Sequence, residues 1–386
     1  MRKLKKGMAA LLTALVAIPS MGAAAPLESG EPVPLTSPSA ILAEASTGTV
    51  IFEKNADERR EVASVTKLMT VLLILEDLEA GRYQLTDQVT VSQSAAAMQG
   101  SQALLDANTA YPLETLLRST IIASANDSAV ALAEFAQGSE AGFVERMNQR
   151  AKELDMADTV YVNCTGYPQE GQHTTARDVL RLSCEVSRHP IYHQYASVWM
   201  ETLTHPSGRT TDLTNTNRLV RFYEGCDGFK TGSTDGAKYC LSATAQKNGL
   251  RLIAIVLGTP QSQTRFDEAR AMLDYGFANY QRVQVAQKGQ SVGQQVTVTR
   301  GSTDRVEAVL GSGLSMLLRV GQDKQLQLEV ELPSTVQAPL EQGDTLGTAR
   351  LLLNGAVIAK LPVVAAQSVP LPGFLEGLFR ILSNWR

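Results

Sequence analysis

Ser64 and Lys67 lie three positions apart at the start of an apolar run that continues to Leu78. A run of this length without Gly or Pro favours a buried helix, with Ser64 in its first turn and Lys67 on the same face. Free backbone N–H groups and the positive end of the helix dipole favour a developing anion there. A serine hydroxyl becomes nucleophilic when a neighbour removes its proton, and a lysine can do this once burial and nearby cations lower its pKa. The pair therefore predicts acyl transfer to a serine.

Two further motifs strengthen this prediction, because an isolated Ser-x-x-Lys is more often a helix cap followed by a solvated lysine. Ser124-Ala125-Asn126 lies between two apolar stretches and is expected at a break between helices. Lys230-Thr231-Gly232 is followed by a turn and a second strand-like segment, residues 238–244, which predicts a β-hairpin. The glycine of this motif allows the backbone of a ligand to approach the strand. Its lysine would supply a cation near Lys67.

The three motifs, in this order, are typical of class A β-lactamases and penicillin-binding proteins. From about Leu35 to its C-terminus the chain resembles the low-molecular-mass penicillin-binding proteins of the D-alanyl-D-alanine carboxypeptidase family. Further stretches that carry the resemblance are Asn163-Cys164-Thr165-Gly166, Thr175-Ala176-Arg177-Asp178 and Asp274-Tyr275-Gly276-Phe277. The resemblance implies hydrolysis of the terminal D-Ala of peptidoglycan stem peptides through an acyl-enzyme, with no cofactor and no metal. It also implies that β-lactams acylate the same serine.

The resemblance assigns a role to each site residue. Ser64 would be the nucleophile, Lys67 its general base, and Ser124 a proton relay. The substrate would be bound by six further residues: Asn126, Lys230, Thr231, Gly232, Ser233 and Arg265.

The resemblance implies different contacts for these substrate-binding residues. Asn126 would hold Lys67 and the substrate amide, whereas Lys230 and Thr231 would meet the terminal carboxylate, with Arg265 nearby. The backbone N–H groups of Ser64 and Ser233 would form the oxyanion hole. Some family members carry histidine at position 233, and others carry Gly or Asp at position 125, so rate and substrate preference stay open.

The N-terminal residues 1–25 are typical of a secretory signal peptide, with a basic start, an apolar core from Met8 to Pro19 and small residues before Pro26. An uncleaved N-terminal anchor is the alternative. Removal of the four basic residues at positions 2–6 changes the net charge from -4 to about -8, which argues against nucleic acid as a partner. We therefore expect an exported protein at the outer face of the cytoplasmic membrane or in the cell wall.

Three regions are expected after the signal peptide. Residues 26–280 mix strands and helices, which predicts an α+β catalytic domain with one antiparallel sheet and helices packed on it. Residues 281–367 contain alternating segments such as 295–299, 326–332 and 348–353, which predict a small antiparallel β domain that lifts the catalytic domain off the membrane. Residues 368–386 predict an amphipathic helix that binds the membrane surface, with docking onto the protein itself as the alternative.

Within the catalytic region, residues 40–45 and 49–54 predict a hairpin around Gly48, and residues 251–257 predict a buried strand. The expected helices span residues 113–122, 127–136, 142–154, 175–188 and 265–280.

The sequence leaves other activities of the same site open. An endopeptidase would use the same residues, and a scaffold would keep them without activity. A β-lactamase needs a glutamate for deacylation, for which Glu153 and Glu170 are the candidates. Four cysteines allow either disulfides or free thiols, and their spacing fits no zinc pattern: Cys164, Cys184, Cys226 and Cys240.

Overall fold

The computed structural model describes residues 32–373, which divide into two compact units. The larger unit contains the described residues up to 287 together with 313–325, and the smaller unit contains 288–312 and the residues from 326 onwards. The predicted signal peptide (1–25) and most of the predicted amphipathic tail (374–386) lie outside the described residues. Within residues 32–373 no helix has the length and apolar character needed to span a membrane.

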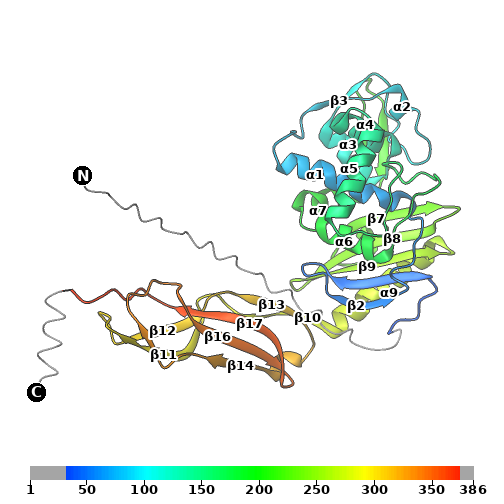
Figure 1. Ribbon diagram of the computed structural model, residues 1–386. Helices are drawn as coiled ribbons and strands as arrows, with labels where there is room; N and C mark the ends of the chain where they lie inside the picture. Colours follow the sequence, from blue (N-terminus) through cyan, green and yellow to red (C-terminus); the bar gives the residue numbers. More distant parts are fainter. Residues whose placement is uncertain (1–31, 374–386) are drawn as a thin grey trace, which may run out of the picture. The chain divides into compact units, whose positions relative to one another are not determined.

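A five-stranded antiparallel sheet forms the centre of the larger unit (Figure 1). Its strand order is β2-β1-β9-β8-β7, so β7, which carries the Lys230 motif, is an edge strand. The strands are β1 (Ser39–Glu44), β2 (Val50–Lys54), β7 (Cys226–Thr234), β8 (Lys238–Lys247) and β9 (Leu250–Thr259). The pairing of β1 with β2 and of β7 with β8 confirms both predicted hairpins.

Different helices cover the two faces of this sheet, because successive side chains of a strand point to opposite sides. In β9, Leu252, Ala254 and Val256 pack in the core that contains α9 (Ser262–Asn279). Ile253 and Ile255 pack in the larger core on the opposite face, which contains α1 and α6 (Figure 1). The predicted arrangement of helices on one antiparallel sheet is therefore confirmed.

The site-bearing helices belong to the larger core. The first of them, α1, follows a 3-10 turn, η1 (Ala63–Thr66), so it begins at Lys67, and Ser64 lies just before it instead of in its first α-helical turn. The helices that complete this unit are α1 (Lys67–Glu79), α2 (Gln93–Ala96), α3 (Leu113–Ile122), α4 (Asn126–Gln137), α5 (Glu140–Glu153), α6 (Ala176–Val186), α7 (Pro190–Ala196) and α8 (Leu219–Phe222). The predicted helices correspond to α3, α4, α5, α6 and α9.

Three two-stranded sheets complete the larger unit. β3 (Gln88–Thr90) pairs with β4 (Ala110–Pro112), and β5 (Met200–Thr204) pairs with β6 (Thr210–Thr214). β10 (Tyr280–Ala286) pairs with β13 (Leu314–Arg319), which precedes a short turn, η2 (Gln322–Gln325). The chain therefore leaves the larger unit after β10 and returns to it for β13.

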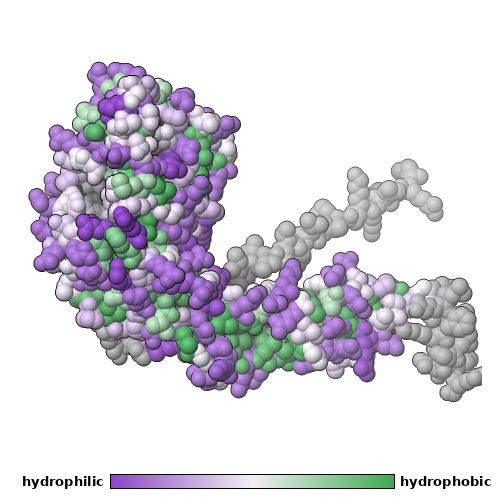
Figure 2. Space-filling model, turned by 180° about the vertical axis from the view of Figure 1, so that it is seen from behind, coloured by the Kyte–Doolittle hydropathy of each residue, from purple (hydrophilic) through white to green (hydrophobic). Residues whose placement is uncertain are grey.

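The smaller unit is a six-stranded sheet in the order β14-β16-β17-β12-β11-β15. Its strands are β11 (Ser291–Thr299), β12 (Arg305–Leu310), β14 (Leu326–Glu331), β15 (Thr335–Gln337), β16 (Thr345–Leu353) and β17 (Ala356–Ala365). The three alternating segments of the sequence lie in β11, β14 and β16, with only Leu332 outside a strand. The prediction of an antiparallel domain is wrong for one pair, because β15 pairs with β11 in parallel. Apolar patches interrupt the hydrophilic surface of this unit, and Leu328 and Val357 are among its exposed large apolar side chains (Figure 2).

Candidate functional site

Two glycines hold the turn that carries Ser64 against its neighbours. η1 contacts the edge strand β7, and a Cβ on Gly232 would lie 2.1 Å from the Val62 carbonyl oxygen and 3.2 Å from the Ser64 nitrogen. Gly166 approaches the same turn from another loop, where a Cβ would lie 1.9 Å from the carbonyl oxygen of Ala63. Only residues without a side chain fit at these two positions. The Ser64 backbone is therefore fixed from two sides.

Lys67 points back from the start of α1 toward this turn. Its Nζ donates to Ser64 Oγ at 2.9 Å and to the carbonyl oxygen of Thr165 at 2.7 Å, and the residue has no exposed surface. Burial lowers the pKa of Lys67 to about 7, although Cys164 and Asp127 act in the opposite sense. An amine with this pKa is neutral in a large fraction of molecules at neutral pH. It can therefore take the serine proton.

Ser124 lies between α3 and α4, at the predicted break between helices, and its φ of 62° is left-handed. Its Oγ and the Asn126 Oδ1 are buried and have no hydrogen-bond partner among the described residues. The Asn126 Nδ2 donates to the Gln99 carbonyl oxygen at 2.5 Å. Lys67 is bonded to Ser64 and Thr165, so the implied contact between Asn126 and Lys67 is absent from the hydrogen bonds of this site.

The third motif supplies a second buried lysine. Lys230 is 2% exposed, and its Nζ donates to the Thr231 carbonyl oxygen at 3.3 Å. Burial, together with the cations Lys67 and Arg265, lowers the pKa of Lys230 well below its ordinary value. Thr231 Oγ1 donates to Thr216 Oγ1 at 2.8 Å, which links the edge strand to the segment before α8.

Arg265 and Ser233 lie at the end of the same motif. Arg265, in the first turns of α9, donates from Nη1 to the carbonyl oxygens of Gly232 (3.0 Å) and Cys240 (3.3 Å). Burial lowers the pKa of Arg265 to about 10, so it stays cationic at neutral pH. Ser233 is exposed and pairs with Tyr239 in the β7–β8 hairpin. The structure therefore brings Arg265 to the predicted motif, where it binds backbone carbonyl groups.

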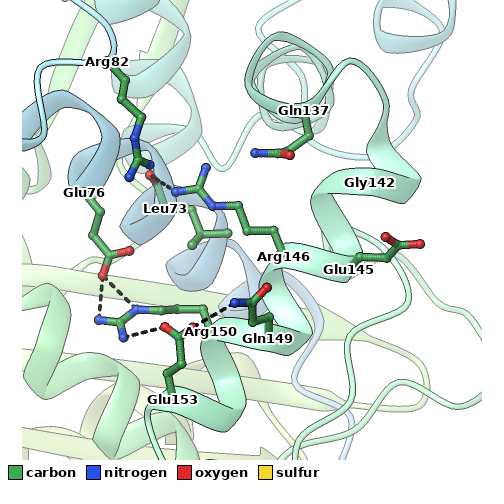
Figure 3. A pocket seen from close by; sticks show the side chains of 10 residues that line it. All are labelled: Leu73, Glu76, Arg82, Gln137, Gly142, Glu145, Arg146, Gln149, Arg150 and Glu153. Carbon is green, nitrogen blue, oxygen red and sulfur yellow. Dashed lines mark hydrogen bonds and ion pairs between the residues drawn. The ribbon is translucent and has the colours of Figure 1, made fainter.

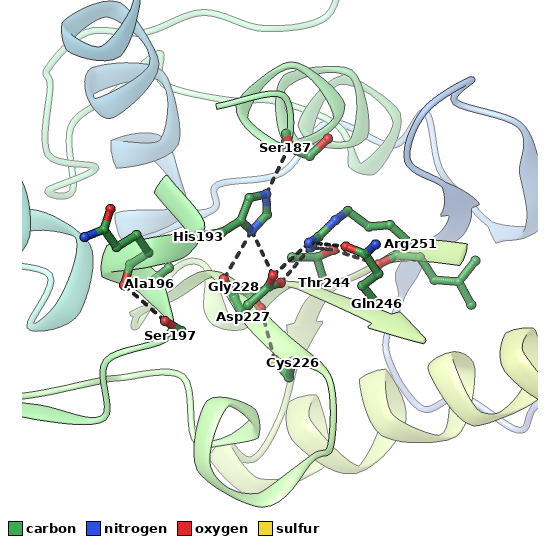
Figure 4. A network of polar contacts seen from close by, with 12 residues as sticks. Ser187, His193, Ala196, Ser197, Cys226, Asp227, Gly228, Thr244, Gln246 and Arg251 are labelled. Carbon is green, nitrogen blue, oxygen red and sulfur yellow. Dashed lines mark hydrogen bonds and ion pairs between the residues drawn. The ribbon is translucent and has the colours of Figure 1, made fainter. Parts of the chain in front are cut away.

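A network of polar contacts fixes the start of the edge strand (Figure 4). Arg251 of β9 donates to both oxygens of Asp227, at 2.6 and 2.7 Å, and His193 Nδ1 lies 3.3 Å from Asp227 Oδ2. Burial alone would raise the pKa of Asp227, but the bonds from Arg251 and His193 outweigh it and lower the pKa to about 2. Among residues 32–373, β7 pairs with β8 alone, so this network adds contacts at the start of an edge strand.

Comparison with known proteins agrees with this geometry. Residues 26–261 match the D-alanyl-D-alanine carboxypeptidase family, peptidase family S11, and residues 280–371 match the C-terminal domain of penicillin-binding protein 5. The chain belongs to the D-alanyl-D-alanine carboxypeptidase family of serine peptidases.

Named relatives of this carboxypeptidase cover nearly its whole length. It is 37% identical over 348 residues to D-alanyl-D-alanine carboxypeptidase DacF of Bacillus subtilis. The aligned residues cover 90% of this chain and 89% of DacF. Identity to DacC of Escherichia coli is 33% over 344 residues, covering 86% and 84%. Penicillin-binding protein 5 from Haemophilus influenzae superposes with a TM-score of 0.75 at 28% identity, covering 89% of this chain and 100% of that one.

One of the two β-lactamase candidates lies away from the carboxypeptidase site. Glu153 accepts hydrogen bonds from Arg150 and Gln149, both at 3.1 Å, in a pocket beside the C-terminal half of α1 (Figure 3). Glu76 of the same pocket is nine residues beyond Lys67, about 14 Å along the helix axis. Glu153 is therefore not placed to activate water at Ser64. Glu170 is exposed in the loop after Gly166.

Sequence reasoning assigned no role to four residues that shape the site. The Thr165 carbonyl holds Lys67, Gly166 supports the Ser64 turn, Thr216 bonds to Thr231, and Asp127 is a fully buried carboxylate next to Asn126. The family resemblance of residues 163–166 was the available signal for the first two. A threonine in a polar loop (Thr216) and an aspartate in the first turn of a helix (Asp127) carry no comparable signal.

The four cysteines are free thiols: Cys164, Cys184, Cys226 and Cys240. Cys226 pairs in register with Ala245 and Cys240 with Gly232, so the two cysteines of the hairpin do not face each other.

Proposed function

We propose that this carboxypeptidase removes the terminal D-alanine from peptidoglycan stem peptides ending in D-Ala-D-Ala, and that β-lactams acylate the same serine. The observation that carries the proposal is the 2.9 Å hydrogen bond between Lys67 Nζ and Ser64 Oγ in a buried site. Membership of the family and the names of the relatives support it.

Acylation begins when the neutral Lys67 amine takes the Ser64 hydroxyl proton and Oγ attacks the carbonyl carbon of the penultimate D-Ala. The bond to the terminal D-Ala nitrogen breaks, and the leaving amine receives a proton. Ser124 is suited to relay it, because its buried hydroxyl has no partner within residues 32–373. Water then hydrolyses the ester: its hydroxyl group bonds to the acyl carbon, the bond to Ser64 Oγ breaks, and the second proton of the water passes to Ser64 Oγ.

The oxyanion and the terminal carboxylate need separate partners. The Ser64 N–H and the Ser233 N–H are proposed as the oxyanion hole, supported by the close approach of Gly232 to the Ser64 nitrogen. Lys230 and Thr231 are proposed to bind the carboxylate. Arg265 keeps the backbone of Gly232 in place and adds positive charge beside it.

The cellular location follows from sequence features outside the described residues. The N-terminal residues 1–25 support export, and the apolar face of residues 374–386 supports attachment to the membrane surface. The smaller β unit would separate the catalytic unit from that surface.

The test combines a fluorescent penicillin with a synthetic peptide ending in D-Ala-D-Ala. We expect stable labelling that peptide mapping places at Ser64, release of D-alanine, and loss of both in Ser64→Ala. Rapid loss of the label would indicate a β-lactamase, and cleavage of a cross-linked peptide in preference to the linear one would indicate an endopeptidase. A folded protein that neither takes the label nor releases D-alanine would overturn the proposal.

A further inference from the structure

Asp127 follows Asn126 at the start of α4 and has no exposed surface. Its carboxylate accepts three backbone N–H groups: Oδ1 from Ala103 (3.0 Å) and Ser128 (2.9 Å), and Oδ2 from Leu105 (3.0 Å). A buried carboxylate is costly unless it is fully hydrogen-bonded, and charge-assisted bonds of this kind are strong. Asp127 therefore binds the segment around residues 103–105 firmly to the helix start.

Asn126 binds the first half of the same segment. Its backbone N–H donates to the Ser101 carbonyl oxygen at 2.7 Å, and its Nδ2 donates to the Gln99 carbonyl oxygen at 2.5 Å. Every second residue from 99 to 105 is thus bonded to one of the two residues at the start of α4. A segment without regular secondary structure is held along the side of the site that bears Ser124.

The tip of the β5–β6 hairpin contacts this segment as well. Arg209 donates to the carbonyl oxygen of Leu104 and, at 2.9 Å, to Asp106 Oδ1, and Ser207 Oγ donates to Asp106 Oδ2 at 3.2 Å. These residues are exposed or half-buried, whereas the bonds to Asp127 are buried. Salt and water weaken exposed pairs far more than buried ones. Asp127 is therefore the stronger of the two attachments.

We propose that Asp127 is a positioning residue for acyl transfer: by binding the N–H groups of Ala103 and Leu105 it fixes segment 99–105, and through it Asn126 and Ser124. The inference rests on the proposed function. Asp127 does not touch the reacting atoms, but its charge also acts on Lys67, because it opposes the burial that lowers the pKa of Lys67.

The chain offers a matched control in Asp77. This carboxylate is also fully buried, but Arg82 and Arg146 bind it near the C-terminal end of α1, where Figure 3 shows both arginines. Replacing it removes a buried carboxylate from the same domain without removing a bond to segment 99–105. A general loss of stability would appear in both variants, whereas a positioning role would appear only at Asp127.

The experiment measures the second-order rate of acylation by a fluorescent penicillin from pH 5.5 to 9, well below each variant's melting temperature. Asp127→Asn should acylate at least tenfold more slowly, and the low-pH limb of its profile should move to lower pH, because Lys67 loses a nearby negative charge. Asp127→Glu keeps the charge but displaces it, so its rate should fall without a shift of that limb. Asp77→Asn should melt at lower temperature with an unchanged rate and profile.

If Asp127→Asn does not fold, the acylation rate of Asp127→Glu tests the positioning role. Acylation of Asp127→Glu within about twofold of the wild-type rate would overturn the proposal. So would a loss of rate in Asp77→Asn equal to that at Asp127. Wild-type protein that is not acylated at all would overturn the proposed function itself, and this inference with it.

Discussion

At the scale of single residues, the site depends on two lysines that are both buried. Water stabilises an ammonium ion, so removing it from water favours the neutral amine, and for Lys230 the nearby cations Lys67 and Arg265 add to this effect. The pKa values of Lys67 and Lys230 are therefore lower than that of an exposed lysine, and both side chains lose a proton more readily. The pKa of Lys67, about 7, is close to the value at which a general base is most effective under neutral conditions.

The pH dependence of acylation should follow the titration of Lys67. Because the neutral amine is the proposed base and its pKa is about 7, the rate should rise as the pH increases from 6 to 8 and then level off. Stopped-flow measurement with a chromogenic or fluorescent β-lactam checks this. A rate that stays constant between pH 6 and 8 would contradict the assignment of Lys67 as the base.

Replacing Lys67 should remove acylation and leave the fold intact. Lys67→Ala deletes the proposed proton acceptor, and Lys67→Arg replaces it with a group that stays protonated, so both should lose at least a thousandfold in acylation rate. Circular dichroism and thermal melting verify the fold. As a control, Lys54→Ala in β2 removes a lysine from the same domain and should acylate normally. Normal acylation in either Lys67 variant would rule out its role.

At the scale of elements, the site is assembled where a 3-10 turn, a helix break and an edge strand meet. The turn carrying Ser64 is positioned by two glycines that belong to other elements. β7 and the loop around Gly166 therefore determine where Ser64, the proposed nucleophile, lies, although neither is adjacent to it in sequence. Substitutions at these glycines test how the turn is positioned, because glycine has no side chain that could take part in the reaction.

Gly166→Ala should impair acylation much more than a comparable glycine substitution elsewhere. At φ +79° a Cβ is strained, and it would lie 1.9 Å from the Ala63 carbonyl oxygen, so the Ser64 turn must move. Gly81→Ala is the matched control, because its φ is +69° and nothing lies within 4 Å of the added Cβ. The control should lose about 1–2 kcal/mol of unfolding free energy with normal acylation. Equal acylation rates in the two variants would contradict the proposed support of the turn.

Arg251→Met should weaken the attachment of β7 in a pH-dependent manner. The lowered pKa of Asp227 means that its carboxylate stabilises the fold above its unfolded pKa near 4, and that this stabilisation is lost as the pH falls through about 2. At pH 7 the variant should lose on the order of 2 kcal/mol of unfolding free energy. The difference from wild type should shrink between pH 5 and 2.

Urea unfolding at several pH values measures this difference. Arg59→Met, which removes an exposed ion pair with Asp158, should change stability little at every pH. A pH-independent loss in Arg251→Met would show that Asp227 is not the group involved.

Much of this arrangement could be predicted from the sequence. The apolar run after Ser64 indicated a buried helix, and the polar break at Ser124 and the hairpin after Lys230 followed from local composition. The attachment of the β5–β6 hairpin to Asp106 and the bonds of Asp127 could not be predicted, because they join segments far apart in sequence. Asp127 bonds to residues more than twenty positions away, and the sequence holds no local pattern for such a bond.

At the scale of the whole molecule, the chain passes between the two units more than once. The chain leaves the larger unit after β10, forms β11 and β12 in the smaller unit, and returns for β13 before it completes the smaller sheet. Because β10 pairs only with β13 within the described residues, a chain cut after residue 287 loses the partner of β10. The catalytic core itself, with its sheet and α9, is complete by residue 279.

Removal of residues 374–386 should release the mature protein from membranes while acylation continues. These 13 residues are too few to cross a bilayer, which needs about 20, but seven of them are large apolar residues that would fall on one side of the helix predicted from the sequence. Burial of that face at the membrane surface would attach the protein reversibly. Flotation with anionic lipid vesicles should recover the full mature chain in the lipid fraction and the truncated chain in solution. Replacing Phe374, Leu378 and Trp385 with serine preserves the length and should have the same effect as truncation, because the interaction depends on apolar area. Equal flotation of all three proteins would show that the attachment lies elsewhere in the chain.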